Sequence, residues 1–281
     1  MVESSTPSDD SVEAGGVVAA KQPVTRRFWT YLQGEVDPKA VNPVSIYSAF
    51  LTGFTSAPTF SACYVWCGFQ TGNVAQLGLA LARTFNMEPY RTGGFQKPDQ
   101  QALCSLLSFL IGATLGRIGD RMGAKRRTWL VTATFLQALM AMAAAIAAHF
   151  DDEVGISVER DKPSWQHAKG FVALAFLSAS LGLQGIIGKR IGSPLNTTIV
   201  LTTTWVEIFN DPLLLNFHPT ASRDVRLAGV FCVFLGAFCA RAILGSRCGM
   251  AGTIGVLAAL RLCQLVWWLL TPSVLPKKDK K

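Results

Sequence analysis

A few charged side chains stand inside long apolar stretches of this sequence, and their chemistry needs an explanation. Arg261 lies near the middle of the apolar segment 251–271, and Glu207 is the only acid in the segment 194–209. A charged group costs about 2.5–3.5 kcal/mol at the centre of a bilayer on insertion scales, so such groups face the protein interior and often mark function. We therefore predict that Arg261 faces other helices, with Glu207 as its first-choice partner. A purely structural salt bridge is an open alternative.

Neutral polar residues form a second set of candidates. Thr71, Gly72 and Asn73 suit the start of a short helix, because Thr or Asn caps a helix and Gly lets the backbone turn. Pro194 favours a first helical turn in the same way. Free N–H groups at such an end attract anions or carboxylates, although ordinary caps at a loop–membrane boundary are the alternative. The candidate substrate-binding residues are Thr71, Gly72, Asn73, Gln184, Thr202, Thr203, Glu207 and Arg261.

Small residues and cysteines carry a different expectation. Gly53, Gly112, Gly116 and Gly236 are predicted to lie at helix–helix contacts, where small residues let backbones approach closely. The seven cysteines lie mostly in apolar segments and form no Cys-x-x-Cys pair, so we predict packing roles and no metal or cofactor site.

The histidines argue against an enzyme. His149, His167 and His218 are the only three, and all lie in or near expected loops. Neither a His-rich motif nor a pair of intramembrane aspartates is present. We therefore expect no catalytic activity.

Composition defines the setting of these residues. Of 281 residues, 50% are hydrophobic and only 16% are charged, against about 25% charged in a typical soluble domain. Residues 40–82 form a run of 43 without a single charge. A soluble enzyme is thereby excluded, and the chain is predicted to be a multi-pass integral membrane protein with the lipid bilayer as its partner. The net charge of +8 gathers at segment ends, which indicates membrane topology and not nucleic-acid binding.

The expected fold is all-α, a polytopic transmembrane helical bundle. A span needs about 20 residues, and six segments are near that length: 44–66, 101–118, 128–149, 169–188, 226–245 and 251–271. Two shorter apolar segments, 71–83 and 194–209, are either full spans or broken, re-entrant helices, so seven or eight crossings are alternatives to six. The five bases of 117–127 place that loop in the cytoplasm, the acidic loop 150–168 outside, and, with six crossings, both termini inside.

The chain also shows signs of an internal repeat. A Gly-Ala-x-x-small-Arg motif begins at Gly112 and again at Gly236, an offset of 124 residues. We divide the chain into a tail 1–40, disordered over 1–25, a first membrane repeat 41–149, a polar loop 150–168, a second repeat 169–271 and a basic tail 272–281. Three crossings per half make the repeats inverted and four make them parallel, whereas a chance likeness of small residues is the alternative to a repeat.

Several motifs together resemble one family. Thr71-Gly72-Asn73 precedes a Leu-, Gly- and Ala-rich stretch, Gly182-Leu183-Gln184 precedes a Thr-rich stretch at 197–204, and Phe-Leu-x-Gly-Ala spans 109–113. Over about residues 44–271, these features resemble the DUF1275 family, also called the YoaK family. The resemblance implies a multi-helix membrane protein and a transporter, with no established substrate.

One departure from that family bears on mechanism. Where the family carries an acid shortly after the first-helix glycine, Gly53 is followed here by Phe54, Thr55 and Ser56. A proton-coupled mechanism that relies on that acid is therefore not expected. The function predicted is that of a small-solute secondary transporter, and the alternative is a non-transporting scaffold or lipid-binding protein; no substrate and no oligomeric state are assigned.

Overall fold

Helices account for the regular structure of this chain. The computed structural model describes residues 24–153, 155–159, 162–199, 201–214 and 218–274, and the elements in these ranges are helices, with two isolated β-bridges beside them. Most of the expected disordered tail and of the basic C-terminal tail lies outside the described residues, whereas Val24 and Thr25 begin a helix. The all-α prediction is confirmed for the part of the chain described.

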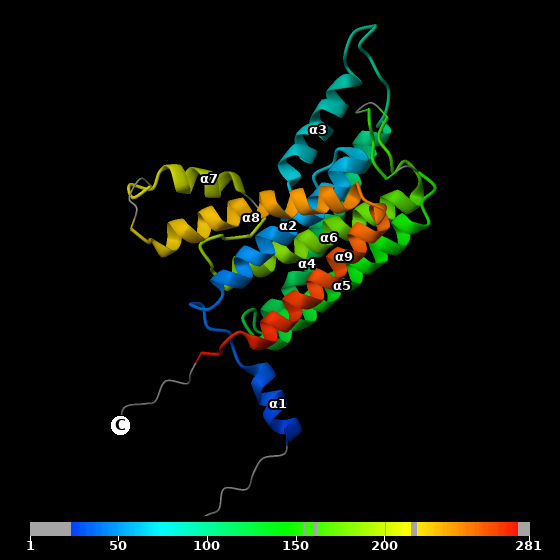
Figure 1. Cartoon of the computed structure of the whole chain (residues 1–281). Helices are drawn as coiled ribbons and strands as arrows, with labels where there is room; N and C mark the ends of the chain where they lie inside the picture. Colours follow the sequence, from blue (N-terminus) through cyan, green and yellow to red (C-terminus); the bar gives the residue numbers. More distant parts are fainter. Residues whose placement is uncertain (1–23, 154, 160–161, 200, 215–217, 275–281) are drawn as a thin grey trace, which may run out of the picture.

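The helices are labelled as in Figure 1, and after α1 the order of one long, one short and two long helices occurs twice. They are α1 (Val24–Gln33), α2 (Asn42–Cys63), α3 (Gln70–Arg83), α4 (Lys97–Met122), α5 (Arg127–His149), α6 (Ala168–Ile191), α7 (Leu201–Phe209), α8 (Ala221–Leu244) and α9 (Gly249–Leu270).

Five of these helices are long and apolar enough to cross a membrane: α4, α5, α6, α8 and α9. The chain is therefore consistent with a multi-pass membrane protein, as predicted. The helix α2 is as long, with 22 residues, but it is more polar, because six buried Ser and Thr side chains follow one another along it: Ser45, Ser48, Thr52, Thr55, Ser56 and Thr59. Most of its side chains face other helices, so α2 needs no continuous apolar surface.

Glycines set the closest helix crossings. A Cβ atom at Gly53 of α2 would lie 1.9 Å from the carbonyl oxygen of Val233 in α8, and one at Gly236 of α8 would lie 2.0 Å from that of Phe50 in α2. Contact this close is possible only without a side chain, as at the small-residue interfaces of membrane helices. The two glycines therefore fix where α2 and α8 cross.

A second crossing has the same construction. A Cβ at Gly112 of α4 would lie 2.0 Å from the carbonyl oxygen of Ala179 in α6, and one at Gly182 of α6 would lie 2.1 Å from that of Phe109 in α4. Gly116 packs on Ile186 one turn further along. Beside these two pairs, α5 packs along both α9 and α6, and the apolar core between them includes Leu177, Leu181 and Leu257.

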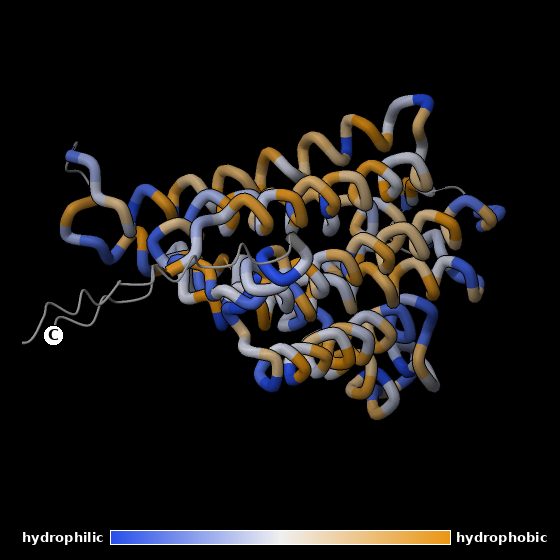
Figure 2. Tube along the Cα trace, turned by 90° about the horizontal axis from the view of Figure 1, so that it is seen from below, coloured by the Kyte–Doolittle hydropathy of each residue, from blue (hydrophilic) through white to orange (hydrophobic). Residues whose placement is uncertain are grey.

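Charged groups gather at the two ends of the bundle. At one end Arg190 of α6 forms an ion pair with Asp120 of α4, with 2.8 Å between Nε and Oδ1. At the other end Lys97 of α4 donates to the carbonyl oxygen of Gln166, just before α6. Figure 2 shows hydrophobic residues along the long helices and most hydrophilic ones in the turns at their ends. The bases expected in a loop at 117–127 lie at the first end, although α4 and α5 leave only residues 123–126 between them.

The helices α3 and α7 each follow a segment in which the chain turns back into the bundle. After α2, the segment 64–69 brings Cys67 to the carbonyl oxygen of Thr55, with 3.7 Å from Sγ to O. After α6, the segment 192–199 brings Thr198 back to Gln184. A Cβ at Gly68 in the first segment would lie 3.2 Å from Cγ2 of Ile199 in the second. We call these the two re-entrant segments, and they meet inside the bundle.

The helix expected over 194–209 is therefore shorter than predicted. The helix α7 begins at Leu201, and Pro194 opens no helical turn. Asn196 and Thr198 have φ angles of 53° and 58°, a left-handed conformation that a helix does not continue through. Interactions with α6 hold the segment unwound, because Gly188 leaves room for the backbone of Thr197.

A cap of backbone and one arginine closes the end that carries α1 (Figure 1). The guanidinium of Arg127 is fully buried and donates to the carbonyl oxygens of Tyr31, Trp268 and Thr271 and to the hydroxyl of Ser273. It also lies 3.9 Å from the centre of the Tyr31 ring. Carbonyls at a helix C-terminus lack partners within the helix, and here Arg127 supplies one for α9.

Candidate functional site

The amide of Gln184, at the middle of the bundle, joins three elements. Its Nε2 donates to the carbonyl oxygen of Ser48 over 2.9 Å, to Oγ1 of Thr52 over 2.7 Å and to Oγ1 of Thr198 over 3.1 Å. The Thr52 hydroxyl donates in turn to the carbonyl oxygen of Thr198 over 3.0 Å. These contacts tie α2, α6 and the second re-entrant segment together, and all four residues are buried.

Arg261 extends the same network from α9. Its Nη1 donates to Oε1 of Gln264 over 3.1 Å, and Nε2 of Gln264 donates to Oγ of Ser48 over 2.7 Å. Arg261 is fully buried, so it faces the interior of the bundle as predicted. We call the set Ser48, Thr52, Gln184, Thr198, Arg261 and Gln264 the central polar network.

A small cavity of about 10 Å³ borders this network: Ser48, Gln184, Thr198 and Gln264 line it, whereas Thr52 and Arg261 do not. It is lined by Ser45, Ser48, Thr134, Gln137, Gln184, Ile187, Gly188, Ile191, Thr198 and Gln264. That volume is close to the least a single water molecule requires. Because amides and hydroxyls dominate the wall, the cavity suits a small polar occupant.

Several buried polar atoms of the network and of the cavity wall have no partner among the described residues. They are Nε and Nη2 of Arg261, Nε2 of Gln137 and Oε1 of Gln184. Buried polar groups are normally hydrogen-bonded, and an unsatisfied one costs about 1–3 kcal/mol, more when it is charged. Three of these atoms are nitrogens that need acceptors, and one is an oxygen that needs a donor. The described residues therefore supply too few acceptors here.

Glu207 is not the partner of Arg261, and that prediction was wrong. Its carboxylate lies 2.9 Å from Nε of Arg226 on α8, next to α7. Because α7 begins only at Leu201 and packs on α8, Glu207 lies outside the central polar network. The amide of Gln264, three residues along the same helix, takes the place expected for an acid.

The other predicted site residues divide between two further places. Asn73 is buried at the start of α3, where its Nδ2 donates to Oε1 of Gln70 over 2.8 Å and to Oγ of Ser105 over 3.3 Å. It does not line the central cavity. Thr71, Thr202 and Thr203 are exposed, as is Gly72, which borders a separate cavity of about 410 Å³ beside Tyr64 and Arg83. Of the eight candidates, the structure brings Gln184 and Arg261 into one network.

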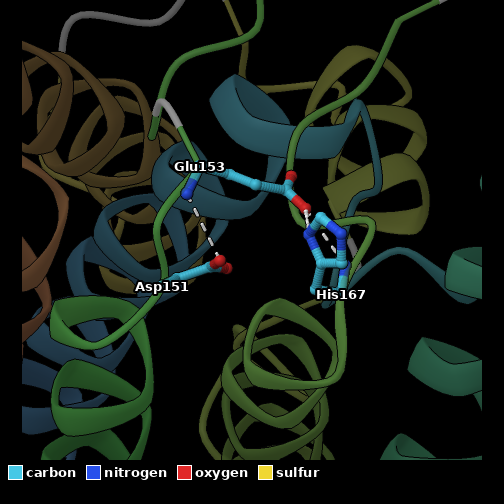
Figure 3. Close-up of side chains that lie close together, drawn as sticks. All are labelled: Asp151, Glu153 and His167. Atoms are coloured by element: carbon cyan, nitrogen blue, oxygen red, sulfur yellow. Dashed lines mark hydrogen bonds and ion pairs between the residues drawn. The ribbon is translucent and has the colours of Figure 1, made fainter.

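Asp151, Glu153 and His167 form a cluster with metal-ligand chemistry in the polar loop (Figure 3). Their ligand atoms lie within 4.8 Å of one another. The Glu153 carboxylate, however, accepts the N–H groups of Gln166 and His167 and contacts the His167 ring, so it caps the start of α6. Burial, with Glu153 nearby, raises the pKa of Asp151. The cluster therefore has a structural explanation.

Sequence reasoning missed most of the central polar network. Ser48, Thr52, Thr198 and Gln264 were not among the candidates, although Gln137 in the cavity wall stands 124 residues before Arg261, the same offset as the repeated motif. A signal for two of them was present, because Ser45, Ser48, Thr52, Ser56 and Thr59 recur every three or four residues within the uncharged run. That spacing places them on one face of a helix.

Comparison with known proteins gives one match. The family model described as "Protein of unknown function (DUF1275)" matches residues 44–267, which include all helices from α3 to α8 and nearly all of α2 and α9. No curated protein and no solved structure matches the chain.

Proposed function

Because this chain belongs to the DUF1275 family, whose function is unknown, we propose its role from its own geometry: it is a secondary transporter that carries a small solute across the bilayer. The observation that carries the proposal is the central polar network, which borders a cavity and includes a buried, partly unpartnered arginine. Ionisable groups inside a membrane are costly and characteristically mark solute or ion pathways.

The proposal includes six membrane crossings. To the five apolar spans we add α2, which runs through the bundle beside α8. At about 1.5 Å per residue, the 14 residues of α3 and the nine of α7 fall short of a hydrocarbon core about 30 Å thick. Six crossings leave both ends of the described chain on one side, and the bases around 117–127 make that side the cytoplasm.

The proposal also includes two inverted repeats, α2–α5 and α6–α9. In support, the first helix of each half packs on the third helix of the other: α2 on α8 through Gly53 and Gly236, and α6 on α4 through Gly182 and Gly112. The last helices, α5 and α9, pack on each other and carry Gln137 and Arg261. Transporters built from inverted repeats bind their solute near the midplane, at the repeat interface.

The re-entrant segments support a transport role and not a catalytic one. In secondary transporters, unwound backbone is found at membrane depth where it lines a solute site. Here Thr198 of the second re-entrant segment lines the cavity, and Gly68 of the first packs on Ile199 beside it. None of the three histidines lines this cavity.

Uptake by liposomes that contain the purified protein tests the proposal. We expect saturable uptake of at least one small solute from a panel of anions, cations and neutral polar molecules. Gln184→Leu should reduce it roughly tenfold or more, because it removes the amide that joins α2, α6 and the re-entrant segment. If no solute enters faster than in protein-free liposomes, the protein is a scaffold or a lipid-binding protein and the proposal is wrong.

Cysteine labelling tests the six crossings separately. In a Cys248→Ser background, Ala124→Cys should react with a membrane-impermeant maleimide only after the cell is opened, whereas a cysteine introduced at Gly94, between α3 and α4, should react from outside. Labelling of position 124 in intact cells would reverse the orientation. Labelling of positions 94 and 124 from the same side would exclude six crossings.

A further inference from the structure

We propose that a small monovalent anion binds at the central polar network, attracted by the buried charge of Arg261. The inference names a solute class for the transport role proposed above. It rests on that role only for movement of the anion, since binding has its own test.

The charge of Arg261 is the first argument. A guanidinium stays protonated in proteins, so burial does not remove its charge. Its hydrogen bond to Gln264 is to a neutral amide. The carboxylates nearest to membrane depth are engaged elsewhere: Glu207 with Arg226, Asp99 with Arg83, and Asp120 with Arg190. A buried charge without a counter-charge is strongly destabilising. A bound anion would supply the negative charge that the described residues do not place beside Arg261.

The balance of donors and acceptors is the second argument. Among the fully buried atoms of these described residues, Nε and Nη2 of Arg261 and Nε2 of Gln137 need acceptors, and Oε1 of Gln184 needs a donor. A cation would need oxygen ligands and would meet a positive charge. An anion in the cavity can accept a hydrogen bond from Gln137, which lines it, and it offsets the charge of Arg261, which is bonded to Gln264 in the cavity wall.

Size and valence follow from the same site. The cavity of about 10 Å³ admits an occupant close in size to a water molecule, before any side chain moves. One guanidinium and neutral amides balance one negative charge, and a dianion would leave a charge uncompensated in a low-dielectric interior. A halide fits this description best, nitrate and formate fit only when side chains move apart, and sulfate and gluconate do not fit.

Thermal unfolding of the purified full chain in detergent, titrated with sodium salts at constant ionic strength, tests the inference. Chloride, nitrate or formate should raise Tm with saturation, relative to sodium gluconate, and exchange of sodium for potassium should change nothing. Arg261→Gln should weaken the apparent affinity at least about tenfold, because it removes the charge. Arg241→Gln, which removes an exposed charge on α8, is the matched control and should respond as the wild type does.

A second variant covers the case in which Arg261→Gln does not fold. Gln264→Glu keeps the side-chain shape and places a carboxylate where the amide oxygen now accepts from Arg261. This internal anion should raise Tm in gluconate and abolish the response to chloride, nitrate and formate. An unchanged response in Gln264→Glu would overturn the inference, as would a wild type that none of the three anions stabilises more than gluconate does.

Flux measurements separate this inference from the transport proposal. Liposomes with the protein should pass the stabilising anion, and those with Gln264→Glu should not. Saturable binding without flux would keep the anion site and overturn the transport role. Uptake of a cation or a neutral solute, with no effect of Gln264→Glu, would keep transport and overturn the anion site.

Discussion

Two arginines of the described chain, Arg127 and Arg261, are fully buried, and their surroundings differ. Arg127 lies at the end of the bundle, where three carbonyl oxygens and one hydroxyl accept hydrogen bonds from its guanidinium and Tyr31 stacks on it. Arg261 lies midway along α9, bound through one nitrogen to an amide, and two of its nitrogens lack partners in the described chain. The two side chains are equally buried, but Arg127 has more hydrogen-bond acceptors around it than Arg261 has.

The difference separates a charge whose hydrogen-bond acceptors all lie within the chain from one that lacks acceptors for two of its nitrogens among the described residues. The carbonyls around Arg127 include the last of α9, which lack helical partners in any case, so the arginine and the helix end satisfy each other. Nothing comparable surrounds Arg261, because the backbone of a helix middle bonds to itself. We infer that Arg127 holds the fold and Arg261 serves the site.

The largest effect is expected from removal of the structural charge. Arg127→Met should lower the free energy of unfolding by about 3–5 kcal/mol, because it leaves the carbonyls of Tyr31, Trp268 and Thr271 buried without donors. Thermal unfolding in detergent measures this, and no anion should restore the loss. A variant as stable as the wild type would remove the structural half of the comparison.

Substitution at a glycine crossing should lower the free energy of unfolding by a smaller amount. Gly53→Ala should cost about 1–3 kcal/mol, since its Cβ would lie 1.9 Å from the carbonyl oxygen of Val233 and α2 must move away from α8. Gly255→Ala in α9, where a Cβ meets nothing within 4 Å, is the matched control and should be neutral. Equal losses in the two variants would show that close packing at Gly53 is not what holds the crossing.

The smallest effect is expected at the exposed acid. Glu207→Gln breaks a partly exposed ion pair with Arg226, which is worth about 0–1 kcal/mol, and it should leave the anion response of Arg261 unchanged. A Tm titration with chloride and formate provides the test. A Glu207 variant with altered anion affinity would connect α7 to the site and reinstate the pairing expected from the sequence.

Composition and spacing predicted the class and the long helices well, for a physical reason. Segments such as 128–149 and 251–271 differ from the observed α5 and α9 by at most two residues at either end, because about 20 mostly apolar residues fit little besides a membrane helix. The interior position of Arg261 followed from the cost of charge in lipid.

Partners in space were not predictable in the same way. The pairing of Arg261 with Glu207 rested on charge alone, and Gln264, three residues away on the same helix, takes that place. The helix expected over 194–209 included 194–199, which is not helical. Contacts with Gly188, Gln184 and Thr52, which are distant in the sequence, hold 197–199 unwound. Hydropathy along the sequence carries no information on such contacts.

Thermal unfolding of Arg261→Met, measured beside Arg127→Met in sodium gluconate, tests the central claim most directly. Met fills a similar volume without charge, and replacement of buried charge by apolar groups is often neutral or stabilising by about 1–4 kcal/mol. We expect Arg261→Met to unfold at or above the wild-type temperature and to ignore chloride, nitrate and formate, while Arg127→Met unfolds far below it. If the two substitutions lower the Tm equally, Arg261 is a structural charge like Arg127 and the account is contradicted.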